Sequence, residues 1–222
     1  QAMNSAVSGV QAGCAGSMAV AGETLFYLSR TGVVSYQGGV PTVISAALGP
    51  GDLSEAAGGS DGTRYYVSLR QGDVWTLYCY DTRTGLWHKE DGVHAKWFAR
   101  ADGVLYYVDA DDRTLYAVGT GGYEGVSWMA ETGDFTDGGP DKEGVLRLHL
   151  RLEADAGTTV TVSVQFDSDG VWRKVRDVTA TRKRSVILPL VPRRCDHWRV
   201  RIEGTGGCKL YGLTREYYKG SM

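Results

Sequence analysis

The chain of 222 residues is short of several residue types, and each shortage excludes a class of protein. Four cysteines, none in a CxxC pair, are too few for a disulfide scaffold, so free thiols are expected. Five prolines exclude collagen and Pro-rich linkers. No apolar run approaches the roughly 18 residues of a membrane span, and no basic region followed by an apolar core marks a signal peptide.

Glycine and the larger aromatic residues are plentiful instead. The chain has 31 glycines, about twice the usual share. Its 13 Tyr and 6 Trp against 4 Phe indicate pleated surfaces on which a ring packs while its polar tip stays hydrated. With 42% hydrophobic and 23% charged residues, the composition is that of a folded globular protein.

Short stretches in which apolar and polar residues alternate occur along the whole chain, and they are rich in aromatic and β-branched side chains. This pattern predicts β-strands. The stretches are 25–29, 64–69, 74–80, 104–108, 145–152, 159–166, 185–190 and 197–202. Asp-Gly pairs, which favour tight turns, separate several of them. Only residues 52–57 suggest a helical turn or two, so the sequence predicts an all-β chain.

The first half contains a degenerate repeat. Strand–turn–strand patterns start near residues 22, 62 and 103, a spacing of about 40 residues that matches one four-stranded propeller blade. A plain antiparallel meander is the alternative, because it repeats the same turn residues. A closed propeller needs about four to eight blades, so the missing blades are expected upstream or from other subunits. Together with the absence of an initiator Met, this favours a C-terminal fragment of a longer polypeptide.

The character of the sequence changes near the glycine-rich residues 119–125. Beyond Trp128 the strands follow one another without a 40-residue repeat, as in a β-sandwich or jelly roll. Residues 1–125 carry 8 Lys and Arg against 13 Asp and Glu, whereas residues 126–222 carry 16 against 13. We therefore predict propeller-like β-meander repeats over 1–125, forming a partial propeller, and a β-sandwich or jelly roll over 126–222.

The segment 171–215 is strongly basic, with 12 Lys and Arg against 3 Asp and Glu. Most of these residues are arginines, which suit bidentate pairing with carboxylate or phosphate. The segment is a candidate surface for an acidic partner subunit or for non-specific DNA contact; a solvated sandwich face is the alternative. The candidate residues are Arg173, Lys174, Arg182, Lys183, Arg184, Arg193 and Arg194.

Catalytic and metal-binding patterns are missing. The sequence has no GxSxG, HExxH or P-loop motif. Cys195, His197 and Cys208 match no zinc spacing, and the Asp-rich turns at 109–112 and 167–170 lack the layout of a calcium loop. We predict a protein that is not an enzyme and has no cofactor or metal site.

Several blocks of the sequence resemble structural proteins of tailed-phage and prophage virions from Gram-positive gut bacteria. The blocks are GLWHKED (85–91), WMAETGDF (128–135), FDSDGVW (166–172), LPLVPRRCDHWRVR (188–201) and GTGGCKLY (204–211). The resemblance implies a non-enzymatic role in head–tail or tail assembly, of the hub or nozzle type. It also implies other virion subunits as partners, a homo-oligomer in the particle and no membrane contact. The expected location is the virion, and the host cytoplasm during assembly.

A carbohydrate- or receptor-binding β module is the alternative function. Trp87, Trp97 and Trp172 lie near expected loops, where their rings would stack on sugar faces. Tryptophans on alternating strands more often belong to a core, however, and Trp172 and Trp198 are predicted to be predominantly buried.

Overall fold

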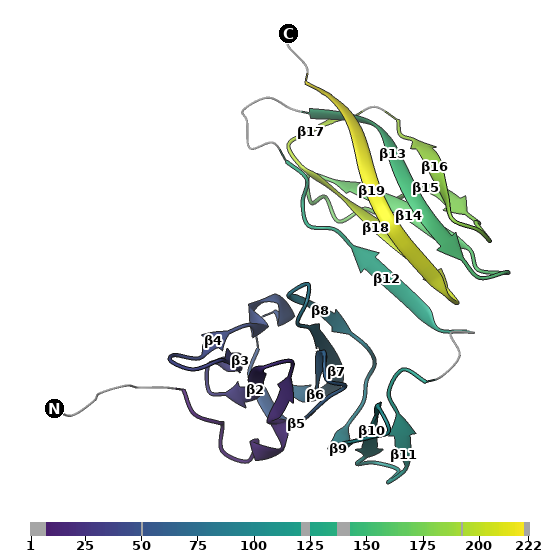
Figure 1. Ribbon diagram of the computed structural model, residues 1–222. Helices are drawn as coiled ribbons and strands as arrows, with labels where there is room; N and C mark the ends of the chain where they lie inside the picture. The colour runs from purple at the N-terminus through teal and green to yellow at the C-terminus, as the bar shows by residue number, and fades with distance from the viewer. Residues whose placement is uncertain (1–7, 50, 121–124, 137–142, 192, 220–222) are drawn as a thin grey trace. The chain divides into compact units, whose positions relative to one another are not determined.

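The computed structural model describes residues 8–49, 51–120, 125–136, 143–191 and 193–219 (Figure 1). The chain is all-β, as predicted, and the described residues contain no α-helix. It divides into two compact units, residues 1–121 and 122–222. The division falls in the glycine-rich stretch to which the sequence analysis assigns the domain boundary.

The N-terminal unit consists of three antiparallel sheets that follow one another along the chain, and none of them is closed. Within each sheet, strands that are neighbours in sequence pair with each other. The first sheet holds β1 (Ala19–Ala21), β2 (Thr24–Ser29), β3 (Gly32–Tyr36) and β4 (Thr42–Val43). The second holds β5 (Leu53–Ser60), β6 (Arg64–Gln71), β7 (Val74–Asp81) and β8 (Leu86–Lys89). The third holds β9 (Ala95–Ala101), β10 (Val104–Asp109) and β11 (Leu115–Ala117). Two short 3-10 helices, Ala15–Ser17 and Ser45–Leu48, precede β1 and β5.

The 40-residue repeat corresponds to this series of sheets. Each predicted repeat start lies in the turn that leads into the second strand of a sheet, namely β2, β6 or β10. Residues 40 apart therefore occupy equivalent places in successive sheets. The series is a run of antiparallel meanders, and none of its sheets is closed.

Apolar side chains join each sheet to the next. Phe26, Leu28 and Val33 of the first sheet share a buried cluster with residues of the second, and the Phe26 ring stacks on that of Tyr65 with centroids 5.0 Å apart. A second cluster joins Tyr66, Leu77 and Cys79 of the second sheet to Leu105 of the third. The Cys79 thiol is therefore buried between the two sheets.

Strand β5 lies against both neighbouring sheets, and two glycines make this possible. A Cβ at Gly58 would overlap the carbonyl oxygen of Ser17, before the first sheet. A Cβ at Gly59 would lie 2.5 Å from Cβ of Phe98, in the third sheet. The two faces of β5 are therefore both in close contact with another part of the unit.

The expected helical turn at residues 52–57 is wrong, because most of this stretch belongs to β5. Its backbone pairs antiparallel with β6, and the pairing shifts register between Ser54 and Ala56. Glu55, at this bulge, has a positive φ of 47°. The weak helical propensity of Ser-Glu-Ala-Ala is overridden by the hydrogen bonds that a sheet partner supplies.

The C-terminal unit is a sandwich of two antiparallel sheets. One has the order β12 (Ser127–Glu131), β18 (Trp198–Thr205), β14 (Val160–Phe166) and β15 (Arg173–Val178). In the other, β13 (Glu143–Ala154) pairs with β16 (Arg184–Pro189) and β17 (Arg194–Cys195), and also with β19 (Cys208–Lys219). The inward side chains of both sheets form one core cluster, which includes Leu148, Leu150, Val162, Trp198 and Val200.

Trp172 and Trp198 differ in how far they are buried. Trp198 is 1% exposed in the core, which confirms its prediction. Trp172 is partly buried, so it does not share the fully buried core position of Trp198. Its alternation with the core positions of β14 is lost at the Asp169–Gly170 turn, and its ring lies instead beside the guanidinium groups of Arg199 and Arg201.

Candidate functional site

A charged network covers the outer face of the β12–β18–β14–β15 sheet. Along β18, Trp198, Val200 and Ile202 are buried, so Arg199 and Arg201 point to the opposite face. The register places Glu131 of β12 opposite Arg201. Arg201 donates from Nε and Nη2 to Glu131 Oε2 at 3.2 and 3.0 Å. Arg199 Nη1 lies 2.9 Å from Glu131 Oε1, so one carboxylate binds two guanidinium groups.

Neighbouring side chains extend this network. Arg199 donates from Nε and Nη2 to Oε1 of Gln165 at 2.9 and 2.6 Å. The Arg201 Cζ atom lies 4.0 Å from the centre of the Trp172 ring, and the Arg199 Cζ atom lies 5.3 Å from it. Gln165 is buried, although it belongs to an outer face. Both arginines thus have acceptors and a ring partner within the sheet itself.

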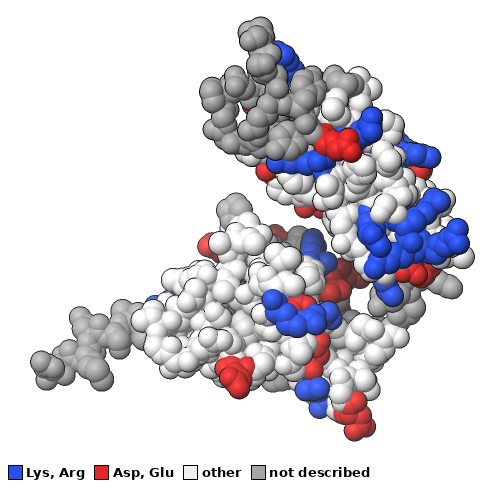
Figure 2. Space-filling model, turned by 45° about the horizontal axis from the view of Figure 1, so that its top comes forward, with Lys and Arg blue, Asp and Glu red and all other residues white. Residues whose placement is uncertain are grey.

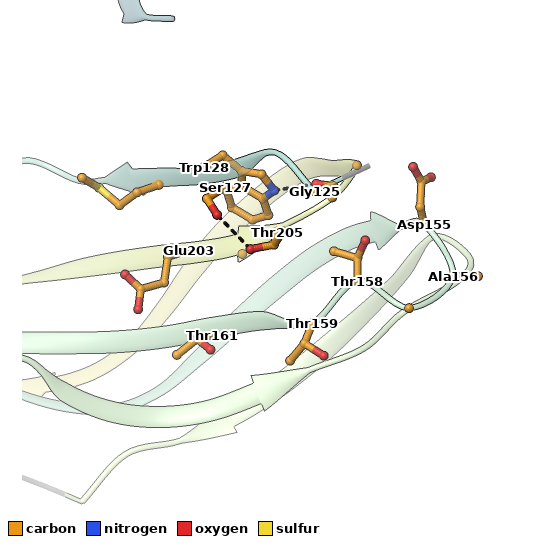
Figure 3. A pocket seen from close by; sticks show the side chains of 15 residues that line it. Gly125, Ser127, Trp128, Asp155, Ala156, Thr158, Thr159, Thr161, Glu203 and Thr205 are labelled. Carbon is orange, nitrogen blue, oxygen red and sulfur yellow. Dashed lines mark hydrogen bonds between the residues drawn. The ribbon is translucent and has the colours of Figure 1, made fainter. Parts of the chain in front are cut away.

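A pocket of about 950 Å³ lies at one end of the same sheet (Figure 3). Its lining comes from β12, β14 and β18, and from the turns that follow β13 and β18. Polar side chains predominate in it: Ser127, Asp155, Thr158, Thr159, Thr161, Glu203 and Thr205. The hydroxyls of Ser127 and Thr205 lie 3.1 Å apart, and Trp128 Nε1 donates to the Gly206 carbonyl oxygen at 2.7 Å. The pocket thus offers hydroxyl and carboxylate groups beside one indole ring.

Glycines shape the wall of the pocket. A Cβ at Gly204 would lie 2.8 Å from the Trp128 ring, and a Cβ at Gly207 would overlap the carboxylate of Asp155. Gly206 has a φ of 97°, which only glycine adopts easily. The Gly-Thr-Gly-Gly run therefore allows the turn after β18 to approach both β12 and the turn after β13.

The seven basic residues singled out from the sequence form more than one group. Arg173 and Arg193 lie near the Phe166 ring, with Cζ atoms 5.9 and 5.4 Å from its centre. Arg173 pairs with Asp169 at 2.7 Å, and Lys174 pairs with Asp177 at 2.6 Å. These acidic partners offset part of the positive charge at the start of β15. Arg194 begins β17, where it pairs through its backbone with Gly144 of β13.

The other three basic residues follow the far end of β15. Arg182, Lys183 and Arg184 are exposed, and Nζ of Lys183 lies 3.9 Å above the centre of the Tyr211 ring. A cleft of about 470 Å³ is lined by Thr179, Ala180, Thr181, Arg182 and Arg184. Hydroxyl and guanidinium groups around a small cleft suit an oxyanion. In the view of Figure 2, Lys and Arg side chains gather on the C-terminal unit, while the visible surface of the N-terminal unit is mostly uncharged.

The histidines and cysteines form no metal centre within the described parts of the chain, where no group of three or more His, Cys, Asp or Glu could hold an ion. His94 stacks on Trp75 with ring centroids 3.8 Å apart. Burial raises the pKa of the Cys79 thiol to about 12, and burial together with nearby Asp155 raises the pKa of Cys208. Both thiols are therefore poor nucleophiles near neutral pH.

Sequence reasoning missed both the Glu131 network and the pocket. The alternation of Arg199, Arg201 and Glu203 was a usable signal for an outer charged face. The partners of that face come from β12 and β14, and their register is not visible in the sequence. The Gly-rich run 204–207 belongs to one of the blocks that carry the resemblance, but its packing against Trp128 depends on the fold.

Comparisons with known proteins add no relative: no protein-family model matches the chain, and no curated protein matches it. Among the described residues, no helix is both long enough and apolar enough to cross a membrane.

Proposed function

We propose that the chain is a non-enzymatic structural protein of a tailed-phage or prophage virion, and that it acts in head–tail or tail assembly. One observation carries the proposal. Four of the five blocks that resemble virion proteins are scattered between residues 128 and 211, and their side chains pack on one another in the sandwich. Glu131 of block 128–135 binds Arg199 and Arg201 of block 188–201, and Trp172 of block 166–172 lies beside both arginines.

Further contacts also join side chains of different blocks within the sandwich. Phe135 forms a β-bridge with Trp198, and their ring centroids lie 4.8 Å apart. Gly204 leaves room for the ring of Trp128. A scattered signature whose members pack on one another is what a shared structural scaffold produces, whereas a shared reaction would gather nucleophiles, acids and bases. This supports an assembly role with other virion subunits as partners, in a homo-oligomer within the particle.

Virion incorporation tests the role directly. In a lysogen that carries this gene, induced particles purified on a density gradient should contain the chain at a fixed ratio to the capsid and tail proteins. Deletion of the gene should leave heads and tails unjoined, or tails incomplete, in electron micrographs. Particles that lack the chain but are normal in structure and infectivity would overturn the proposal.

The cleft at Arg182–Arg184 supports contact with phosphate, so sequence-independent DNA binding is a proposed part of this role. Binding of duplex DNA should weaken steeply between about 50 and 200 mM salt, because each phosphate contact releases counterions. Changing Arg182, Lys183 and Arg184 together to Ala should remove most of the binding. The matched control changes Arg173 and Lys174 to Ala, since their charges are already paired with Asp169 and Asp177.

Two results of this measurement would contradict DNA contact at the cleft. The first is no binding even at low salt, which would leave docking onto an acidic subunit as the role of the basic residues. The second is binding that neither salt nor the triple change weakens.

The pocket at the end of the sandwich supports a second candidate function, which is glycan or receptor binding. Its hydroxyl and carboxylate groups can hydrogen-bond a polyhydroxylated ligand, and its volume of about 950 Å³ admits one. Of the three tryptophans considered for a sugar platform, Trp97 alone is largely exposed, at 60%, and it lies in the other unit. A glycan array should show binding that Glu203→Gln and Thr161→Val weaken. No binding by the unaltered chain would remove this candidate.

A further inference from the structure

The contact between successive sheets of the N-terminal unit repeats with the 40-residue period. Phe26 and Leu28 of β2 are buried against the second sheet. Forty residues later, Tyr66 of β6 is buried against the third sheet. Ser68, the equivalent of Leu28, accepts a hydrogen bond from the backbone N–H of Ala95 at the start of β9. In both cases these two positions of the second strand face the next sheet in the series.

The residues on the same face of the third sheet belong to none of the buried hydrophobic clusters of the described residues. Its register puts eight uncharged side chains on this face, which we call the open face of β9–β11. They are Trp97, Ala99 and Ala101 of β9, Val104, Tyr106 and Val108 of β10, and Leu115 and Ala117 of β11. Tyr106 and Val108 are the equivalents of Phe26 and Leu28. Trp97 is 60% exposed and Leu115 is 62% exposed, although both are large apolar side chains.

The opposite side of the third sheet has a partner. Leu105 is 3% exposed and belongs to the cluster with Tyr66 and Leu77 of the second sheet. This side also carries charge, since Arg100 lies opposite Leu105 in the register. The sheet thus has one face that is packed and partly charged, and one that is uncharged and partly exposed.

The first sheet has an exposed row on the side away from Phe26, although Tyr27 and Val34 on the same side are buried. Val20, Leu25 and Tyr36 lie in one row across β1, β2 and β3. Val20 is 58% exposed and Tyr36 is 36% exposed. Leu25 is the equivalent of Tyr65 and Leu105, whose side chains are buried against the preceding sheet. We call this row the open face of β1–β4.

We propose that the open face of β9–β11 in one copy docks onto the open face of β1–β4 in a second copy. The two open faces of one chain are the two halves of a contact that occurs twice inside the unit, so a second copy supplies what each face lacks. Tyr106 would then meet Leu25 of the other copy, as Phe26 meets Tyr65. Such head-to-tail contacts close into a ring when the rotation allows it. Two copies with three sheets each give a ring within the range of four to eight blades.

Self-association is the first test. The mass in solution, measured by light scattering across a concentration series, should reach that of two chains. Changing Trp97 and Leu115 together to Asp should give a monomer, because charge would be buried in the contact. The matched control changes Val74 and Val191 to Asp, which are also exposed but lie on neither open face, and it should still dimerise. Circular dichroism should show that both variants are folded.

Mixing distinguishes head-to-tail docking from other arrangements. Val20→Asp with Tyr36→Asp alters only the open face of β1–β4, and this variant should also be monomeric. Mixed with the Trp97 and Leu115 variant, it should recover a two-chain species, because one intact pair of faces remains. If the Val20 and Tyr36 variant still dimerises alone, the open faces of β9–β11 dock on each other and the proposal fails.

Cross-linking tests the same contact without introducing charge, so the proposal can still be tested if an Asp variant does not fold. Leu25→Cys with Tyr106→Cys should give cross-linked dimers with a short bismaleimide, and Leu25→Cys with Val74→Cys should not. A chain that is monomeric at all concentrations, or equal cross-linking of both variants, would overturn the proposal. The inference goes beyond the virion role and fails separately from it, since a dimer can form whether or not the chain enters particles.

Discussion

Replacing Trp198 by Ala should destabilise the C-terminal unit strongly. Trp198 is 1% exposed in the core, and its ring packs on Phe135. Removing a buried Trp side chain costs about 3–5 kcal/mol of unfolding free energy. Within the described part of the chain, however, the buried indole Nε1 has no hydrogen-bond acceptor. Since an unsatisfied buried donor costs about 1–3 kcal/mol, removing it offsets part of the loss. We therefore expect a loss near the lower end, about 3 kcal/mol.

Trp172→Ala is the matched comparison. Trp172 is half-buried and contacts mainly the guanidinium groups of Arg199 and Arg201. A cation–π contact at a partly exposed site contributes about 0.5–1 kcal/mol. The loss on removing this ring should therefore be about 1 kcal/mol, well below that of Trp198→Ala.

Urea unfolding, followed by hydrogen exchange of peptides from β14, reports on this unit alone. With a slope of about 1–3 kcal/mol per molar urea, Trp198→Ala should lower the midpoint by about 1–3 M. Trp198→Phe should lower it less, because it keeps an aromatic ring and removes the unpaired donor. Equal losses for Trp198→Ala and Trp172→Ala would refute this assignment of core and surface roles.

Two further predictions concern the N-terminal unit. Gly59→Ala should cost about 1–3 kcal/mol of unfolding free energy, because its Cβ would meet Phe98 in the next sheet. Gly9→Ala is the control, since a Cβ there meets nothing within 4 Å. Equal melting temperatures of the two variants would contradict the close contact at Gly59. Arg83 holds the pKa of Asp81 below its usual 3.8. The ionised carboxylate therefore stabilises the fold above that unfolded-state value, and this stabilisation is lost as the pH falls through the folded-state pKa. The melting temperatures of Asp81→Asn and the unaltered chain should differ most at neutral pH and converge in acid; a constant difference would exclude this ion pair as the cause.

The local features of the fold could be predicted from the sequence. Strict alternation at 145–152 and 159–166 depends only on neighbouring residues, and these stretches became β13 and β14. Residues 52–57 were misassigned because helix propensity depends only on neighbouring residues and does not include hydrogen bonds to a sheet partner such as β6. Trp172 is less buried than Trp198 because it follows a tight turn, which changes the face that the next residue occupies.

The site could be predicted less well than the fold. That Arg199 and Arg201 lie on an outer face follows from alternation with Trp198. That both bind Glu131 requires the pairing of β12 with β18, strands about 70 residues apart in sequence. The pocket likewise depends on two turns that meet only in the folded unit.

The glycine pair of β5 has a consequence for cooperativity. In a series of stacked repeats, each unit touches only its neighbours, and end units can open separately. Because Gly58 and Gly59 bring β5 against both sides at once, opening the second sheet exposes apolar surface on the first and third together. Amide protons of β5 should therefore exchange only on global unfolding of the N-terminal unit, whereas those of β11, at the end of the series, should exchange through local fraying.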